Sequence, residues 1–125
     1  SMETAQSFFQ TGVTADTAGG FDYSPYSINT ATATNANGNP GFYAPSGSNA
    51  ANPISASHAA NLHLSGSWEN GMLLSIKAPS NASAFNLTVH ASGSDKIDGS
   101  STLTLESDNA AVTLLRCHGN RWSIV

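Results

Sequence analysis

The chain has 125 residues, which suits one domain, and 39% of them are hydrophobic, so it can bury a core. Only 10% are charged, and the formal net charge is −4 with four Lys and Arg in all. Cations this few do not form the clustered patch that nucleic acid or an anionic membrane requires, so we expect neither partner. The sequence has no apolar run near the about 20 residues that span a bilayer and no signal-peptide pattern at its start, so we expect no membrane insertion.

The first half of the chain, residues 1–60, is low in complexity. Residues 29–52 contain no charged side chain and are rich in Gly, Pro, Asn and Ser, which favour turns and loops. Short extended pieces are expected at residues 7–10, 13–15 and 24–28. We expect this half to be a loop-rich segment that wraps the sheet of the second half, or neighbouring subunits, within a single domain.

The second half, residues 61–125, alternates apolar and polar residues with the period of strands that have one buried face. The strand at 111–117 is apolar on both faces near its middle, which predicts a central strand. Asn70-Gly71, Asp98-Gly99 and His118-Gly119-Asn120 predict hairpin turns. The predicted strands cover residues 61–67, 72–78, 85–91, 102–106, 111–117 and 122–125.

Taking the apolar face of each predicted strand gives a predicted core. It consists of Leu62, Leu64, Met72, Leu74, Ile76, Phe85, Leu87, Val89, Leu103, Leu105, Val112, Leu114, Trp122 and Ile124.

Six short strands joined by turns predict an all-β fold, an antiparallel β-sandwich or jelly-roll-like domain. About 65 residues make a marginal core, because so small a domain buries only about 60% of its unfolded surface. The last strand also ends on a sheet edge without a helix to cover it, and such edges must be managed. The low charge count indicates that neighbouring subunits supply part of the cover.

The C-terminal third, residues 93–125, resembles a segment that recurs at the end of bacteriophage tail-fibre, tail-spike and capsid-decoration proteins. The resemblance covers about half of the chain, extends more weakly back to residues 73–89, and departs in detail at residues 117–121. It implies a trimeric β-sandwich of a virion. The residues that carry it are Gly93, Ile97-Asp98-Gly99, Leu103, Leu105, Asn109-Ala110, Val112-Thr113-Leu114, Gly119-Asn120, Trp122, Ile124 and Val125.

Candidate metal ligands lack a recognised spacing. His58 and His63 are five residues apart, which fits no zinc signature, and His90 and His118 lie far from them in sequence. We therefore expect no metal and no cofactor, and ordinary surface or interface histidines.

Candidate catalytic groups are equally sparse. Two pairs of carboxylates, Asp95 with Asp98 and Glu106 with Asp108, lie at turns, where Asp bonds nearby backbone N–H groups. Cys117 and the adjacent His118 point to opposite faces of a strand, and no Gly-x-Ser-x-Gly elbow occurs. The sequence therefore predicts a protein that is not an enzyme.

Aromatic residues are the best candidates for ligand or partner binding: Tyr23, Tyr26, Phe42, Tyr43 and Trp68. Exposed Tyr and Trp offer stiff contact area with a polar tip. The alternative, which we favour, is that they pin the loop-rich first half to the sheet.

The leading hypothesis is a non-enzymatic phage virion structural protein, from a fibre tip, a spike tip or a capsid decoration. It would be a homotrimer that contacts other virion proteins and is made in the host cytoplasm, since the single Cys117 rules out an intrachain disulfide. A carbohydrate-binding or host-receptor-binding adhesin module, with a host-surface glycan as partner, is the first alternative. The second is the C-terminal domain of a phage depolymerase.

Overall fold

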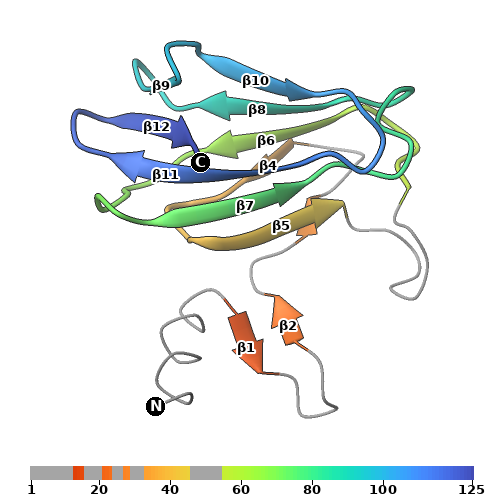
Figure 1. Ribbon diagram of the computed structural model, residues 1–125, viewed down its shortest axis with the longest axis horizontal. Coiled ribbons are helices and arrows are strands. Elements are labelled where there is room, and N and C mark those ends of the chain that lie inside the picture. The colour runs from red at the N-terminus through yellow and green to blue at the C-terminus, as the bar shows by residue number, and fades with distance from the viewer. Residues whose placement is uncertain (1–12, 16–20, 24–26, 29–32, 46–54) are drawn as a thin grey trace.

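The computed structural model describes residues 13–15, 21–23, 27–28, 33–45 and 55–125, and these form two large sheets and one small one (Figure 1). The small sheet pairs β1 (Val13–Ala15) with β2 (Phe21–Tyr23). The four-stranded sheet has the order β10-β8-β6-β4, and the six-stranded sheet has the order β3-β5-β7-β11-β12-β9. The strands are β3 (Ser27–Ile28), β4 (Ala33–Asn35), β5 (Gly41–Pro45), β6 (Ala60–Leu64), β7 (Leu73–Lys77), β8 (Leu87–Ala91), β9 (Lys96–Ile97), β10 (Thr102–Leu105), β11 (Ala111–Cys117) and β12 (Arg121–Ile124).

From β3 to β8 the chain alternates between the two large sheets, so every two strands make one coil. β3, β5 and β7 lie side by side in parallel in one sheet, and β4, β6 and β8 do the same in the other. The residues stack in register from coil to coil, with Ala33 beside Asn61 and Asn61 beside Thr88. This is solenoid-like stacking, in which each repeat contacts its neighbours along one axis.

The all-β prediction is confirmed, whereas the predicted antiparallel sandwich or jelly roll is wrong. β6 and β8 run parallel, as do β5 and β7, and within the two large sheets the antiparallel pairs come from β10, β11 and β12. The physical reason is that an alternating pattern reports one buried face and is identical for parallel and antiparallel partners. The chain direction is decided at the corners, where the backbone crosses to the other sheet.

The C-terminal strands reverse direction and close the stack. β10 lies antiparallel beside β8, and β11 lies antiparallel beside β7, so the last coil has a partner in each sheet. β11 is a central strand, as its two apolar faces predicted, because it lies between β7 and β12. β12 is not the uncovered edge that the sequence suggested, since the short β9 pairs with its other side through Trp122 and Ile97.

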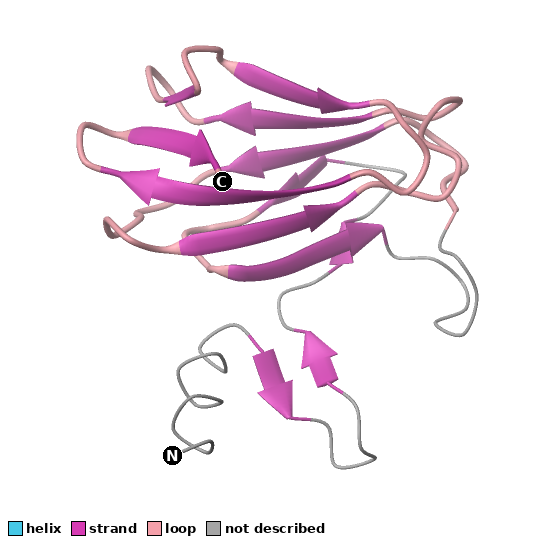
Figure 2. Cartoon of the chain, viewed as in Figure 1, coloured by secondary structure: helices cyan, strands magenta, loops and turns pink. Residues whose placement is uncertain are grey.

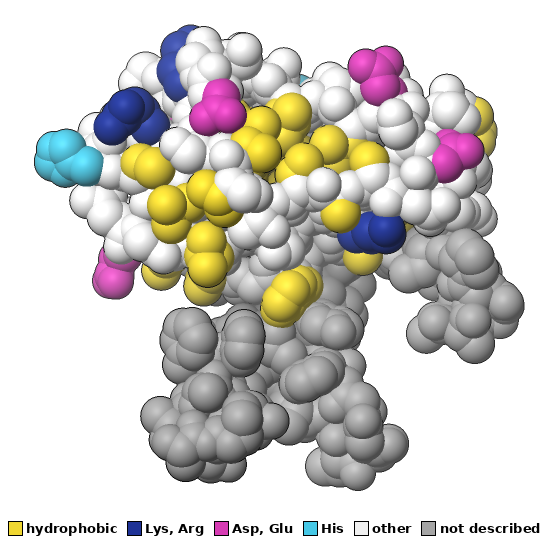
Figure 3. Space-filling model, viewed as in Figure 1, with side chains coloured by type: hydrophobic (Ala, Val, Ile, Leu, Met, Phe, Trp, Pro, Cys, Tyr) yellow, Lys and Arg dark blue, Asp and Glu magenta, His cyan; other side chains and the backbone are white. Residues whose placement is uncertain are grey.

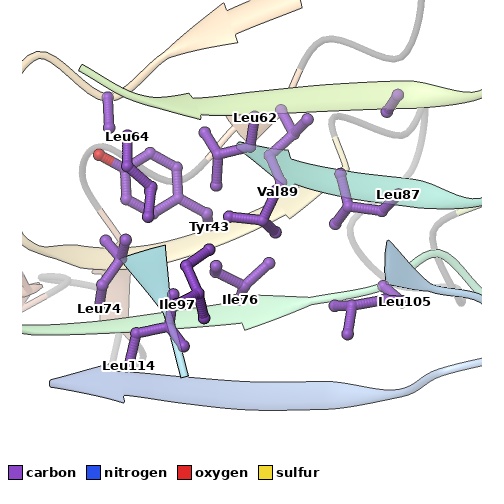
Figure 4. Packing of buried hydrophobic residues seen from close by; sticks show 14 of the residues in the cluster. Tyr43, Leu62, Leu64, Leu74, Ile76, Leu87, Val89, Ile97, Leu105 and Leu114 are labelled. Carbon is purple, nitrogen blue, oxygen red and sulfur yellow. The ribbon is translucent and has the colours of Figure 1, made fainter. Parts of the chain in front are cut away.

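The core lies between the two large sheets, where apolar side chains form ladders that run from strand to strand (Figure 4). Nine predicted core residues are buried, whereas Met72, Phe85, Leu103 and Val112 are half-buried and Ile124 is 41% exposed. Tyr43 of β5, Ile28 of β3 and Ile97 of β9 add to the core from segments that sequence patterns did not assign to it. The nine are Leu62, Leu64, Leu74, Ile76, Leu87, Val89, Leu105, Leu114 and Trp122.

Two glycines allow successive corners to stack directly on one another. Gly38 follows β4 and has φ +73°, and Gly66 follows β6 and has φ +92°. A Cβ at Gly66 would lie 2.4 Å from the backbone of Asn37, and the Gly38 N–H donates to Ser65 O at 2.7 Å. Only glycine fits this approach of backbone to backbone.

The predicted hairpin at Asn70-Gly71 is wrong, because it joins β6 and β7, which belong to different sheets. Gly71 has a positive φ, as the pattern required, but the turn serves as a corner of the coil. The turn at His118-Gly119-Asn120 is a true hairpin between β11 and β12. A positive φ is a local property of the turn, whereas the sheet in which the next strand pairs is decided by the tertiary structure.

From β3 on, the described strands of the first half belong to the same stack, whereas β1 and β2 form their own sheet. β4 pairs with β6, and β5 pairs with β7, so they lie in the sheets of the second half. Extended structure was expected at 13–15 and 24–28 and is found at β1 and β3, whereas residues 7–10 lie outside the described residues. Figure 2 shows strands and loops throughout, and no helix that could cross a membrane occurs among the described residues.

Candidate functional site

The outer face of the six-stranded sheet carries exposed apolar side chains together with small polar and cationic ones. Leu74, Ile76 and Leu114 point into the core, so the alternate residues of β7 and β11 point outward. Leu73 lies beside Leu115 in the outward rows and is 48% exposed, and Val125, which donates its N–H to Thr113 O, is 67% exposed. We call Leu73, Leu115 and Val125, with the small residues between them, the apolar face.

Charged side chains lie at the margin of the apolar face. Figure 3 shows hydrophobic side chains gathered over its middle, with Lys, Arg, Asp and Glu around the rim. The ammonium of Lys77 donates to Asn109 O at 2.6 Å, and Arg121 Nε donates to His118 O at 3.0 Å. In the middle, the hydroxyls of Ser75 and Thr113 bond to each other at 3.1 Å. The middle of this face therefore presents apolar groups and two hydroxyls that are hydrogen-bonded to each other.

The outer face of the four-stranded sheet has a different character, because its outward residues are uncharged and, apart from Ala33, polar. They form two in-register rows across β4, β6, β8 and β10. No charged residue occurs at the outward positions of these four strands. The rows are Ala33, Asn61, Thr88, Thr104 and Asn35, His63, His90, Thr102.

Two histidines meet on this polar face. The rings of His63 and His90 are stacked with centroids 4.4 Å apart and an interplanar angle of 14°. His90 Nε2 lies 2.9 Å from Asn61 Oδ1. Partial burial, and then the neighbouring His63, hold the pKa of His90 below its ordinary value of 6.5. His90 is therefore mainly neutral at neutral pH.

A cluster of aromatic and charged side chains lies on the inward side of β11 and β12. Arg116 is 6% exposed, its guanidinium forms a 3.0 Å ion pair with Asp95, and it lies 5.1 Å from the ring centroid of Trp122. Trp68 meets Trp122 edge to face at 4.9 Å and donates Nε1–H to Leu64 O at 3.2 Å. This cluster packs the interior, where a pairing partner and an aromatic ring surround the buried guanidinium.

The predicted binding aromatics whose side chains the structure describes, Phe42, Tyr43 and Trp68, lie at different places in the fold. Tyr43 is buried and donates its hydroxyl to Asn39 O at 2.7 Å, and burial raises its pKa far above the ordinary value of 10.0. Trp68 packs on Trp122, and Phe42 lies on the outer side of β5. Tyr23 belongs to β2, and Tyr26 lies outside the described residues. Tyr43 and Trp68 thus pack against the body of the stack.

Two of the predicted turn carboxylates, Asp98 and Asp108, contact backbone N–H groups. Asp98 Oδ1 and Oδ2 each lie 3.4 Å from the N–H of Ile124, and Asp95 pairs with Arg116. Asp108 accepts the Ser83 N–H at 2.8 Å, and this bond lowers the pKa of Asp108 below its usual range. Glu106 is exposed at the end of β10.

The remaining candidates lie apart from the stacked histidine pair. His58 and His118 are exposed, and Cys117 Sγ contacts Ser123 Oγ at 3.4 Å. Within the described part of the chain, no three His, Cys, Asp or Glu side chains converge as metal ligands would.

The fold places the chain in the class of β-solenoid-like proteins with closing antiparallel strands. A scan of protein-family models finds no match to the chain, and a search of curated proteins finds none either. Sequence reasoning missed the His63–His90 pair, because the two residues are 27 positions apart and only parallel register brings them together. It also missed the apolar face as a unit, although the two-sided apolar pattern of residues 111–117 was a signal for it.

Proposed function

We propose that this chain is a non-catalytic structural module of a virion, in a fibre tip, a spike tip or a capsid decoration, that assembles with copies of itself. The observation that carries the proposal is the apolar face, on which Leu73 and Val125 are 48% and 67% exposed. Exposed apolar groups ringed by polar ones are typical of interaction surfaces, and interface cores are depleted in charge. The resemblance of residues 93–125 to phage virion proteins supplies the virion context.

The occupant of the apolar face is a second copy of the chain. A face whose middle carries no charged side chain can meet its own copies without bringing charged side chains together there, whereas the rim charges stay in water. Lys77 and Arg121 are both held toward backbone carbonyls. Three copies can direct this face toward a common axis, and the number three rests on the resemblance. A permanent assembly of this kind buries about 2,000 Å² or more in total.

The test is the mass of the particle in solution, measured by native mass spectrometry and light scattering at micromolar concentration. We expect three times the chain mass of 12.8 kDa. Leu73→Asp should shift the particle toward monomer, because it places a charge in the interface core. Thr104→Asp, on the opposite sheet, is the matched control and should leave the assembly intact. A wild-type monomer would contradict the proposal, and so would equal effects of the two variants.

A further inference from the structure

Parallel pairing of β6 with β8 places two imidazoles side by side at the surface. His63 is the direct register partner of His90, and the rings lie 4.4 Å apart between centroids. Both side chains are half-buried, on a sheet face whose outward positions carry no charge. In-register residues on adjacent strands are held by the backbone at a fixed spacing, so the two rings stay within reach of each other.

The tautomer of His90 is defined by its neighbour. Asn61 Oδ1 is an acceptor only, so His90 Nε2, at 2.9 Å, carries the hydrogen and donates it. Nδ1 of that ring then holds a lone pair. A second hydrogen bond that orients the ring through its other nitrogen is the arrangement found around metal-binding histidines.

We propose that His63 and His90 bind one divalent transition-metal ion of the Zn²⁺, Ni²⁺ or Cu²⁺ class, with water in the remaining coordination positions. Imidazole nitrogen suits these ions, whereas Mg²⁺ and Ca²⁺ prefer oxygen ligands. The ring of His63 must turn out of the stack so that its lone pair and that of His90 Nδ1 converge on the ion, while His90 keeps its hydrogen bond to Asn61. Both histidines point away from the core, which Leu62 and Val89 help to fill, so this turn changes a surface torsion and no core packing.

The site has fewer protein ligands than a structural zinc site, which has four, so binding is expected to be reversible and weaker than in such sites. It lies on the four-stranded sheet, away from the apolar face of the six-stranded sheet. The inference therefore does not depend on the proposed self-association, and either can fail without the other.

The experiment titrates the full, untagged chain with NiCl₂, ZnCl₂ and MgCl₂ at neutral pH by isothermal calorimetry. NMR of the histidine ring protons identifies the ligands. We expect one Ni²⁺ or Zn²⁺ per chain, no binding of Mg²⁺, and shifts confined to His63 and His90. His63→Asn and His90→Asn should each weaken binding about tenfold or more, because each removes a ligand, and the loss of an orienting partner alone costs about ten- to hundredfold.

The chain offers matched controls in its other histidines. His58→Asn and His118→Asn change exposed histidines away from the pair and should leave the affinity unchanged. Asn61→Ala keeps both ligands and should weaken binding while circular dichroism shows an intact fold. Absence of saturable binding would overturn the proposal, as would equal loss in His118→Asn and His63→Asn. One ion per two chains would also overturn it, since two copies would then share the ion.

Discussion

The parallel coils from β3 to β8 and the antiparallel strands from β10 to β12 are held together by different means. The coils rely on apolar ladders between the sheets and on corners in which Gly38 and Gly66 stack backbone on backbone. The closing strands rely on a hairpin and on a buried ion pair, Arg116 with Asp95. A repeating stack can continue indefinitely, so its end needs distinct chemistry. In this chain the C-terminal end of the stack is closed by a polar cluster set into an apolar core.

Removing the partner of the buried guanidinium should have the largest effect. Asp95→Ala leaves Arg116, 6% exposed, without its carboxylate, and such a loss costs about 3–5 kcal/mol of stability. Glu106→Ala, at an exposed carboxylate just after β10, should change stability by about 0.5 kcal/mol or less. Urea unfolding measures both. Similar midpoints for the two variants would mean that the ion pair does not hold the closing strands.

A cavity within the coils should cost nearly as much. Leu87 of β8 is fully buried, so Leu87→Ala should destabilise the chain by about 2–5 kcal/mol. Ile124→Ala at the end of β12, where the side chain is 41% exposed, should cost clearly less. Thermal unfolding of both variants tests the contrast. An unchanged melting temperature for Leu87→Ala would show that this ladder is not part of the stabilising core.

The corners can be tested with two glycines of nearly equal φ. Gly66→Ala adds a clash with the backbone of Asn37 to the strain of a positive φ, whereas Gly71→Ala meets nothing within 4 Å. The strain costs about 1–2 kcal/mol in both, and the clash adds about 1–3 kcal/mol in the first. Chemical unfolding should show that Gly66→Ala is clearly less stable than Gly71→Ala. Equal losses would contradict the direct stacking of coil corners.

The smallest of these effects on stability is expected from acidification, which acts on His90 of β8 beside β6. The pKa of His90 is lowered in the folded chain relative to 6.5, so the unfolded chain takes up more protons as the pH falls below 6.5. Stability attributable to His90 is therefore lost from pH 6.5 downward. Melting temperatures from about pH 8 to about pH 5, with a chelator present, measure this loss. His90→Asn should show a flatter profile, and an identical profile would contradict the assignment.

Much of the strand content was predictable because alternation is a local pattern. Each of the six strands predicted in residues 61–125 overlaps an observed strand, and Leu62, Leu74 and Val89 are buried as expected. The short β9 was missed, since two residues carry no period. Tyr43 stood among loop-forming residues, and nothing local distinguished it from a surface tyrosine.

The candidate sites were less predictable, because each joins residues that are distant in sequence. The apolar face combines Leu73 of β7 with Leu115 of β11, and the histidine pair combines His63 with His90. Side-chain pattern determined which residues face inward, since burial of one face imposes a period of two. Which strands became neighbours, and in which direction, was decided only by the tertiary structure. The corners send successive strands to opposite sheets, and no local preference records where the next strand will pair.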